Sequence, residues 1–209
     1  MNPYLSSRHK RALDILGAVV GLALSAPLLT FAAVAIRLEG PGHFIYRQRR
    51  VGLDGEPFEL FKLRTMVTGA ETMGAGLAVD QGDERITRVG ALLRRTSLDE
   101  LPNLINVLRG EMSLVGPRPT VQVQVDRYTP QQRRRLETRP GITGWAQVNG
   151  RASLPWHERI ELDLVYLDRA CLREDLRILA MSVRMVVTGH GLYRGETGGW
   201  REPPRPGRS

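Results

Sequence analysis

The feature that most constrains this chain is an apolar segment close to its N-terminus. Residues 15 to 36 include no Asp, Glu, Lys or Arg. As an α-helix, a segment of this length would measure about 33 Å, which is enough to cross the hydrocarbon core of a bilayer. The sequence therefore predicts a helix embedded in a membrane.

Positive charge flanks this segment on both sides. Arginine and lysine mark the cytoplasmic side of a membrane segment, so both ends are predicted to be cytoplasmic. The basic residues are Arg8, Lys10 and Arg11 before the segment, and Arg37, Arg47, Arg49 and Arg50 after it.

A proline interrupts the segment near its middle, in Ser25-Ala26-Pro27. Proline lacks an N–H and clashes with the preceding turn, so the helix should break or kink there. The Ser25 hydroxyl is available to cap backbone groups that Pro27 frees. A re-entrant helix, which enters the membrane and returns to the same face, accounts for the charges, the proline and the length together.

Two other interpretations of the segment compete with the re-entrant helix. One is an ordinary transmembrane anchor with a kink. The other is a cleaved secretory signal, because Lys10-Arg11, the apolar run and Ala33-Val34-Ala35 resemble its three parts. The run is long for a signal and Asp14 lies at its start, so the re-entrant helix is favoured.

The length and composition bound the class of protein. The 209 residues suffice for one domain with a core. A net charge of +8 favours polyanionic partners, namely nucleic acid, anionic lipid or phosphorylated substrates. A single cysteine, Cys171, excludes an internal disulfide and fits a reducing compartment.

The rest of the chain predicts an α+β fold that is mostly helical. We expect the membrane helix in residues 1–39, a cytosolic catalytic domain in residues 40–194 and a disordered tail in residues 195–209. Two strands, residues 43–48 and 58–63, should form a hairpin around the turn at residues 52–57. Helices are predicted at residues 98–108 with an end at Gly110, and at residues 130–137, 154–170 and 174–188. Residues 68–82, rich in Gly and Ala, predict a mobile loop beside the candidate site at residues 97–102.

The last predicted helix is basic and amphipathic. Leu176, Leu179, Val183 and Val186 share one side, with Arg173, Arg177 and Arg184 interspersed. Such a helix can lie in a membrane interface or pack its apolar side on the core, and both interpretations stay open.

The strongest local motif is Ser97-Leu98-Asp99-Glu100-Leu101-Pro102, at the start of a predicted helix. Ser97 and Glu100 have the spacing of a capping box, which is a purely structural interpretation. The same position also suits chemistry, because a helix N-terminus holds a carboxylate ionised and fixed for use as a nucleophile or metal ligand.

Phosphate-binding cations accompany this motif. Arg118 lies between Pro117 and Pro119, whose fixed φ angles present the guanidinium from a stiff loop. Arg94 lies just upstream of the carboxylates, and Lys62 is one of two lysines in the chain. Each of these cations alone could be an ordinary solvated charge on the surface. Together with the two carboxylates they predict a site that binds a diphosphate and a metal.

The motifs in this order resemble the bacterial sugar transferases called monotopic phosphoglycosyl transferases. The resemblance runs from about Arg8 to Tyr193. Its motifs are Lys10-Arg11 with Asp14, the apolar segment, residues 61–66, 97–102, 112–119 and 139–151, and Glu161-Leu162-Asp163. It implies a re-entrant helix in the cytoplasmic leaflet of the bacterial inner membrane, with a UDP-sugar and polyprenyl (undecaprenyl) phosphate as substrates.

The resemblance also implies roles for individual residues. Asp99 would attack the sugar-bearing phosphorus, release UMP and carry the phosphosugar until polyprenyl phosphate displaces it, in the first membrane step of glycoconjugate or exopolysaccharide synthesis. Glu100 would hold Mg²⁺, and Lys62, Arg94 and Arg118 would meet phosphate. Asp163 and Asp175 are weaker substrate-binding candidates, with a structural ion pair as the alternative for each.

The chain departs from the family pattern in two places. Ala26 separates Ser25 from Pro27, where relatives usually show Ser-Pro, and the short N-terminus resembles a minimal catalytic form. Two rival functions remain: a non-enzymatic basic protein on the membrane surface, and a one-step transferase with Asp99 as general base. A nucleic-acid partner is not expected, and the sequence does not indicate which sugar or pathway is used.

Overall fold

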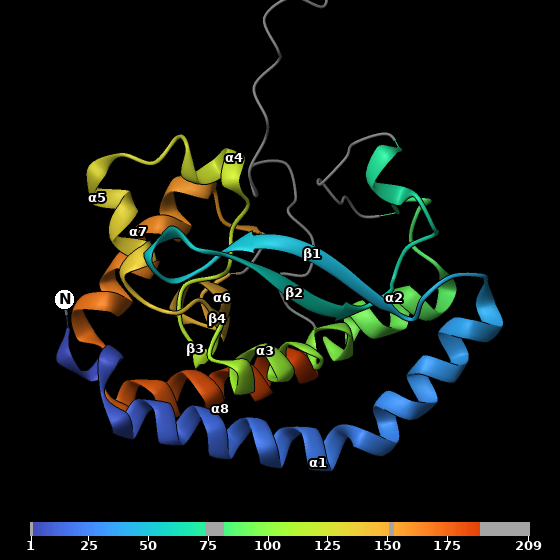
Figure 1. Cartoon of the computed structure of the whole chain (residues 1–209), viewed down its shortest axis with the longest axis horizontal. Coiled ribbons are helices and arrows are strands. Elements are labelled where there is room, and N and C mark those ends of the chain that lie inside the picture. Colours follow the sequence, from blue (N-terminus) through green and yellow to red (C-terminus); the bar gives the residue numbers. More distant parts are fainter. Residues whose placement is uncertain (1, 74–81, 151–152, 189–209) are drawn as a thin grey trace, which may run out of the picture.

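A computed structural model describes residues 2–73, 82–150 and 153–188 (Figure 1). The predicted tail at residues 195–209, and most of the loop predicted at residues 68–82, lie outside the described residues. Within them the fold is mostly helical, with two small two-stranded sheets, as the sequence predicts.

The apolar segment forms α1 (Arg8–Glu39), a single helix of 32 residues that contains Pro27 and is bent partway along (Figure 1). The kink is confirmed, but the predicted role of Ser25 is wrong. Proline leaves the carbonyl four residues earlier, that of Ala23, without its donor. The Ser25 hydroxyl donates instead to the carbonyl of Gly21, at 2.6 Å.

One side of α1 packs against the rest of the chain, and the other side is exposed. Ala18 and Ile36, near opposite ends of the helix, are both buried. On the outer side Leu24, Phe31 and Leu38 are 79%, 74% and 84% exposed. The helix is long and apolar enough to cross a membrane by length and composition.

The predicted hairpin is confirmed. Strand β1 (Ile45–Val51) pairs antiparallel with β2 (Pro57–Leu63), with Ile45 opposite Leu63 and Val51 opposite Pro57. The turn between them contains the 3-10 turn η2 (Leu53–Gly55). There Gly55 has a φ of 84°, a left-handed conformation that glycine adopts without steric cost.

The helix predicted at residues 98–108 is divided. A 3-10 turn, η4 (Leu98–Glu100), precedes the helix α3 (Asn103–Arg109), and Pro102 lies between them. Proline cannot donate to a preceding carbonyl, so it begins a helix more readily than it continues one. The predicted end is correct, because Gly110 closes α3 in the left-handed conformation with a φ of 83°.

The remaining predicted helices are present, with shifted bounds. Residues 130–137 form α5 (Pro130–Arg133), which continues as the 3-10 turn η5 (Arg134–Glu137). The C-terminal pair is α7 (Trp156–Arg169) and α8 (Leu172–Thr188). The other elements are η1 (Pro3–Ser6), η3 (Ala70–Thr72), α2 (Arg88–Arg95), α4 (Gln122–Val125), α6 (Trp145–Val148), and the parallel strands β3 (Ser113–Val115) and β4 (Gly141–Thr143).

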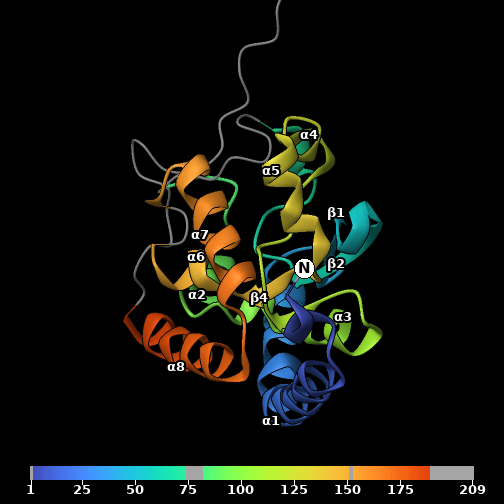
Figure 2. The same cartoon turned by 90° about the vertical axis from the view of Figure 1, so that its left-hand side faces the viewer.

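Helix α8 divides its apolar residues between two surfaces. Ile178 is fully buried in the main core, and Leu179 packs against that core. Leu172, Leu176 and Val183 are each at least half exposed. Helix α8 lies beside α1 along the same edge of the molecule in Figures 1 and 2, and both helices carry exposed apolar residues. This arrangement favours the interfacial interpretation of α8, which stays a prediction.

Gly90 in α2 provides a test of the packing that positions the site. A Cβ added at this position would lie 2.0 Å from the backbone oxygen of Thr65, which leads out of β2. We expect Gly90→Ala to lower the free energy of unfolding by about 3 kcal/mol, because backbone cannot move aside as a flexible side chain can. Gly40→Ala, with no atom within 4 Å, is the matched control. Equal melting temperatures for the two purified variants in detergent would contradict this packing.

Candidate active site

The two adjacent carboxylates lie in the turn η4, where the chain passes from α2 to α3. Ser97 begins this turn with a left-handed φ of 57° and makes no side-chain cap hydrogen bond there. The Glu100 side chain points to Lys62 and Arg118 rather than back to Ser97. The capping-box interpretation is therefore wrong.

Glu100 is bound by two cations from separate parts of the chain. Its Oε1 accepts from Nζ of Lys62, in β2, and from Nη2 of Arg118, in the loop after β3, each at 2.8 Å. Burial by itself would raise the pKa of Glu100, but the charges of Arg118 and Lys62 outweigh it and hold that pKa well below its usual range. Glu100 is accordingly a fixed anion that joins the hairpin to the loop.

Asp99 is held differently from its neighbour. Asp99 is only 9% exposed. Burial raises the pKa of Asp99, and the charge of Lys62 acts in the opposite direction. Arg94 and Arg118 also favour its ionised form. The sequence attributed ionisation to a helix N-terminus, whereas in the structure the neighbouring cations are what oppose protonation of this carboxyl.

The three predicted phosphate-binding cations surround this pair. Lys62 is partly buried beneath Glu100, and burial lowers its pKa, partly offset by the Glu100 charge. The guanidinium of Arg94 reaches toward the Thr65 hydroxyl at 3.5 Å. The Arg118 side chain is 43% exposed, against 13% for Glu100, so it lies at the opening of the site. The structure thus brings together Asp99, Glu100, Lys62, Arg94 and Arg118.

Asp163 lies deeper, behind Arg118. It is almost fully buried and forms an ion pair with Arg135, with 2.6 Å between Oδ2 and Nη2. Burial raises the pKa of Asp163 to about 6, opposed chiefly by the charge of Arg135. The charge of Asp163 also helps to raise the pKa of Arg118. The Asp163–Arg135 ion pair therefore lies beside the site. The geometry matches the structural alternative for Asp163, and its substrate-binding role stays a prediction.

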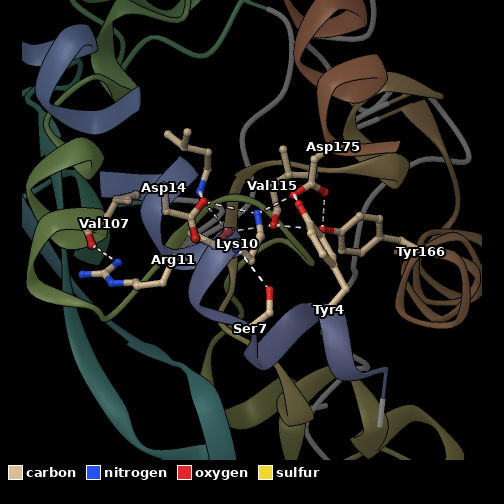
Figure 3. A network of polar contacts seen from close by, with 11 residues as sticks. Tyr4, Ser7, Lys10, Arg11, Asp14, Val107, Val115, Tyr166 and Asp175 are labelled. Carbon is tan, nitrogen blue, oxygen red and sulfur yellow. Dashed lines mark hydrogen bonds and ion pairs between the residues drawn. The ribbon is translucent and has the colours of Figure 1, made fainter. Parts of the chain in front are cut away.

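Asp175 belongs to a separate buried network (Figure 3). It accepts from the hydroxyls of Tyr4 and Tyr166 at 2.8 and 2.7 Å, and forms an ion pair with Lys10 at 2.8 Å. Lys10 also contacts Asp14. The network fastens the start of α1 to α7 and α8, again in agreement with the structural alternative.

Comparison with known proteins decides the family. A family model described as bacterial sugar transferase matches residues 5–189, which include every site residue described above. The chain belongs to the bacterial sugar transferase family. The resemblance seen in the sequence is thereby confirmed.

Three relatives illustrate this membership. An uncharacterized sugar transferase, EpsL of Bacillus subtilis, is 42% identical over 185 residues, which are 88% of this chain and 90% of that protein. A UDP-glucose:undecaprenyl-phosphate glucose-1-phosphate transferase of Caulobacter vibrioides is 45% identical over 193 residues, 88% of this chain and 72% of that protein. The Escherichia coli protein of the same description is 42% identical over 182 residues, 83% of this chain and 39% of its own length.

The sequence reasoning overlooked one residue beside this family's carboxylate pair. Arg50 appeared only as a flanking charge of the membrane segment, yet the hairpin places it on the face that carries Lys62. The period-two alternation of a strand was the signal that could have found it, because residues 46, 48 and 50 share one face.

Asp175 offers a test that separates structural from substrate-binding aspartates in this sugar transferase. We expect Asp175→Asn to lower the free energy of unfolding by about 3 kcal/mol, because it leaves Lys10 buried with a weakened counter-charge. The exposed Asp168, paired with Arg134, is the control, and Asp168→Asn should leave the stability almost unchanged. Thermal denaturation in detergent measures both. Unchanged stability with a raised KM for a UDP-sugar would instead support substrate binding by Asp175.

Proposed function

We propose that this protein transfers a sugar 1-phosphate from a UDP-sugar to polyprenyl phosphate, releasing UMP, through a covalent intermediate on Asp99. The observation that carries the proposal is the carboxylate pair Asp99 and Glu100 surrounded by Lys62, Arg94 and Arg118. The names of the Caulobacter and Escherichia coli relatives describe this overall reaction with glucose 1-phosphate. An Aeromonas hydrophila relative is named for N-acetylgalactosamine, so family membership does not choose the sugar.

The first step forms the covalent intermediate. A carboxylate oxygen of Asp99 attacks the sugar-bearing phosphorus, and the bond from that phosphorus to the bridging oxygen breaks. The electron pair leaves with the bridging oxygen, which becomes part of the UMP phosphate. Asp99 then carries the sugar 1-phosphate as an acyl phosphate.

The second step returns the enzyme to its starting state. A phosphate oxygen of the polyprenyl acceptor attacks the phosphorus on Asp99, and the bond between that phosphorus and the carboxylate oxygen breaks. The product is a polyprenyl diphosphate sugar, and Asp99 is again a free carboxylate. Each step forms one phosphorus–oxygen bond and breaks one, so no oxidant or further reactant is required.

The surrounding cations suit both steps. Two phosphates approach a site that already holds two carboxylates, and their mutual repulsion has to be offset. Arginine forks bind phosphate oxygens in pairs, and a lysine supplies a compact charge. Lys62 and Arg118 also fix Glu100, which keeps the turn that presents Asp99 in one position.

We propose Mg²⁺ as the cofactor, held by Glu100. In the described residues no group of three or more His, Cys, Asp or Glu side chains could hold a metal. Magnesium commonly binds through one or two carboxylates together with substrate phosphates, so the single carboxylate of Glu100 suffices. Both cations bind Oε1 of Glu100, so Oε2 is the oxygen left for a metal. When bound, the ion would neutralise diphosphate charge and stabilise the leaving phosphate.

We propose a monotopic position on the cytoplasmic face of the bacterial inner membrane, and the anchoring of α1 supports the monotopic part of this proposal. Near its start, Arg11 donates to the carbonyl of Val107 at 2.7 Å. Near its end, the Arg64 guanidinium donates to the carbonyl of Ile36 at 3.1 Å. Because both ends are fastened to the same globular body, a helix that ends on opposite sides of a bilayer does not fit this geometry.

Labelling of introduced cysteines tests this topology. In a Cys171→Ser background, Ser6→Cys and Glu56→Cys place thiols at exposed positions before and after α1. We expect a membrane-impermeant maleimide to label both in inverted vesicles and neither in intact spheroplasts, because both ends are cytoplasmic. Labelling of the two positions from opposite sides would establish the ordinary transmembrane anchor instead.

Removal of the nucleophile tests the chemistry. We expect Asp99→Asn to lower UMP release from UDP-sugars, measured with Mg²⁺ and undecaprenyl phosphate, by at least about a thousandfold. The amide has no anionic oxygen with which to attack phosphorus. Asp126→Asn, at an exposed position after α4, is the matched control and should keep wild-type activity.

Trapping distinguishes the rival functions. Intact-mass measurement after incubation with a UDP-sugar alone should show the added mass of a sugar phosphate on wild-type protein and none on Asp99→Asn. Turnover without an adduct would favour one-step transfer with Asp99 as general base. Lipid binding without any turnover across a panel of UDP-sugars would favour the non-enzymatic membrane protein.

A further inference from the structure

Arg50 lies on the face of the hairpin that carries Lys62. In the register of β1 and β2, Tyr46 is opposite Lys62, and opposed residues of two paired strands point to the same face. Alternation along β1 then adds Gln48 and Arg50 to this face and directs Arg49 to the other. The hairpin therefore carries two cations, Lys62 and Arg50, toward the same side.

The charge of Arg50 has no acidic partner in the part of the chain that the structure describes. Its Nη2 donates to Oε1 of Gln48, a neutral amide. Its Nε is buried without a hydrogen-bond partner, and no carboxylate of the described residues lies within 4.0 Å of it. A buried guanidinium with an unused donor is costly unless an anion binds it.

The surroundings of Arg50 add to this cost. Burial first, and then the Arg118 charge, lower the pKa of Arg50 to about 10. Burial and the Arg118 charge also lower the pKa of Arg159 to about 10. Positive charge thus accumulates around Arg118 beyond what Glu100 balances, as expected for a site that binds an anion.

Arg50 lies at the Arg118 end of the site rather than the Arg94 end. The N–H of Val51 donates to the carbonyl of Thr120 at 2.9 Å, which brings the end of β1 beside the loop that carries Arg118. Arg94 belongs to α2, which lies at the opposite end of the hairpin in Figure 1. The charges acting on Asp99 include those of Lys62, Arg94 and Arg118, whereas those acting on Arg50 include Arg118 and Glu100.

We propose that Arg50 binds the donor phosphate that leaves as UMP, while Asp99 attacks the sugar-bearing phosphorus. The inference rests on the proposed function and assigns the two phosphates of the donor to two ends of one site. Nε and an Nη of one guanidinium suit two oxygens of a single phosphate. Gln48 keeps the guanidinium in position, and the charge of Arg50 stabilises the negative charge that develops on departing UMP.

Binding of UMP measures this role without requiring turnover. Isothermal titration of UMP into the full-length protein in detergent should give a Kd at least tenfold higher for Arg50→Gln than for wild type. Arg49→Gln is the matched control, because Arg49 is adjacent in sequence, exposed and directed to the opposite face. It should bind UMP as wild type does. Arg50→Lys, which keeps the charge without the fork, should give an intermediate Kd.

Steady-state kinetics identify which substrate Arg50 serves. With Arg50→Gln, the KM for the UDP-sugar and the inhibition constant for UMP should rise together, and the KM for undecaprenyl phosphate should stay unchanged. A rise confined to the lipid substrate would overturn the proposal and place the acceptor phosphate at Arg50.

The outcomes separate this inference from the proposed function. Wild-type UMP affinity in Arg50→Gln refutes the role of Arg50, whatever the transfer assay shows. Failure of wild-type protein to bind UMP counts against the proposed function itself. Should Arg50→Gln melt well below wild type, Arg50→Lys decides the matter, because unchanged UMP affinity in that variant together with restored stability would indicate a structural role only.

Discussion

The attachment of both ends of α1 to one globular body is the constraint on which the rest of the structure depends. At the start of the helix, Lys10 and Asp14 are buried, and Asp14 accepts from the hydroxyl of Ser113 and the N–H of Leu114 at 2.9 Å. Buried ionic groups are stable only when each has partners, so this end has one arrangement in which all are satisfied. At the other end, Ala32 and Ile36 pack with Leu63 and Leu93 in a small apolar cluster. The apolar middle of the helix is left exposed.

This attachment joins the apolar surface of α1 and the candidate active site in one frame. The contact of α1 with β3 fixes the strand that precedes Arg118, and its contact with α2 fixes the helix that carries Arg94. The site residues therefore inherit their positions from the helix that carries the exposed apolar surface. Such a frame suits the proposed reaction between a water-soluble nucleotide sugar and a lipid phosphate, which requires the carboxylates to stay at a constant distance from the bilayer.

Within this frame the two carboxylates differ in the direction in which their pKa values are shifted. Glu100 is paired with two cations and stays ionised, while burial raises the pKa of Asp99. Two adjacent acids in one short turn thereby separate into a fixed anion and a carboxylate whose charge depends on its neighbours. Arrangements that drive the pKa values of neighbouring acids apart are typical of catalytic sites.

Features that depend on local pattern could be predicted from the amino-acid sequence. These are the apolar segment with its kink at Pro27, the hairpin, the helix end at Gly110 and the family, which follows from motifs that persist along the chain. Length, charge and chain-breaking residues act over a few positions, so they can be read without knowing the fold. The carboxylate pair and its three cations were also identified in this way.

The contacts of the charged residues, in contrast, became known only from the folded chain. It showed that Glu100 binds Lys62 and Arg118 instead of capping a helix, and that Asp175 joins Lys10 in a buried network. It also placed Arg50 beside Arg118. The energy of a charge depends on its burial and on partners that are distant in sequence, as Lys10 at the start of α1 and Asp175 in α8 are. No local pattern contains that information, since the partners meet only when the chain has folded.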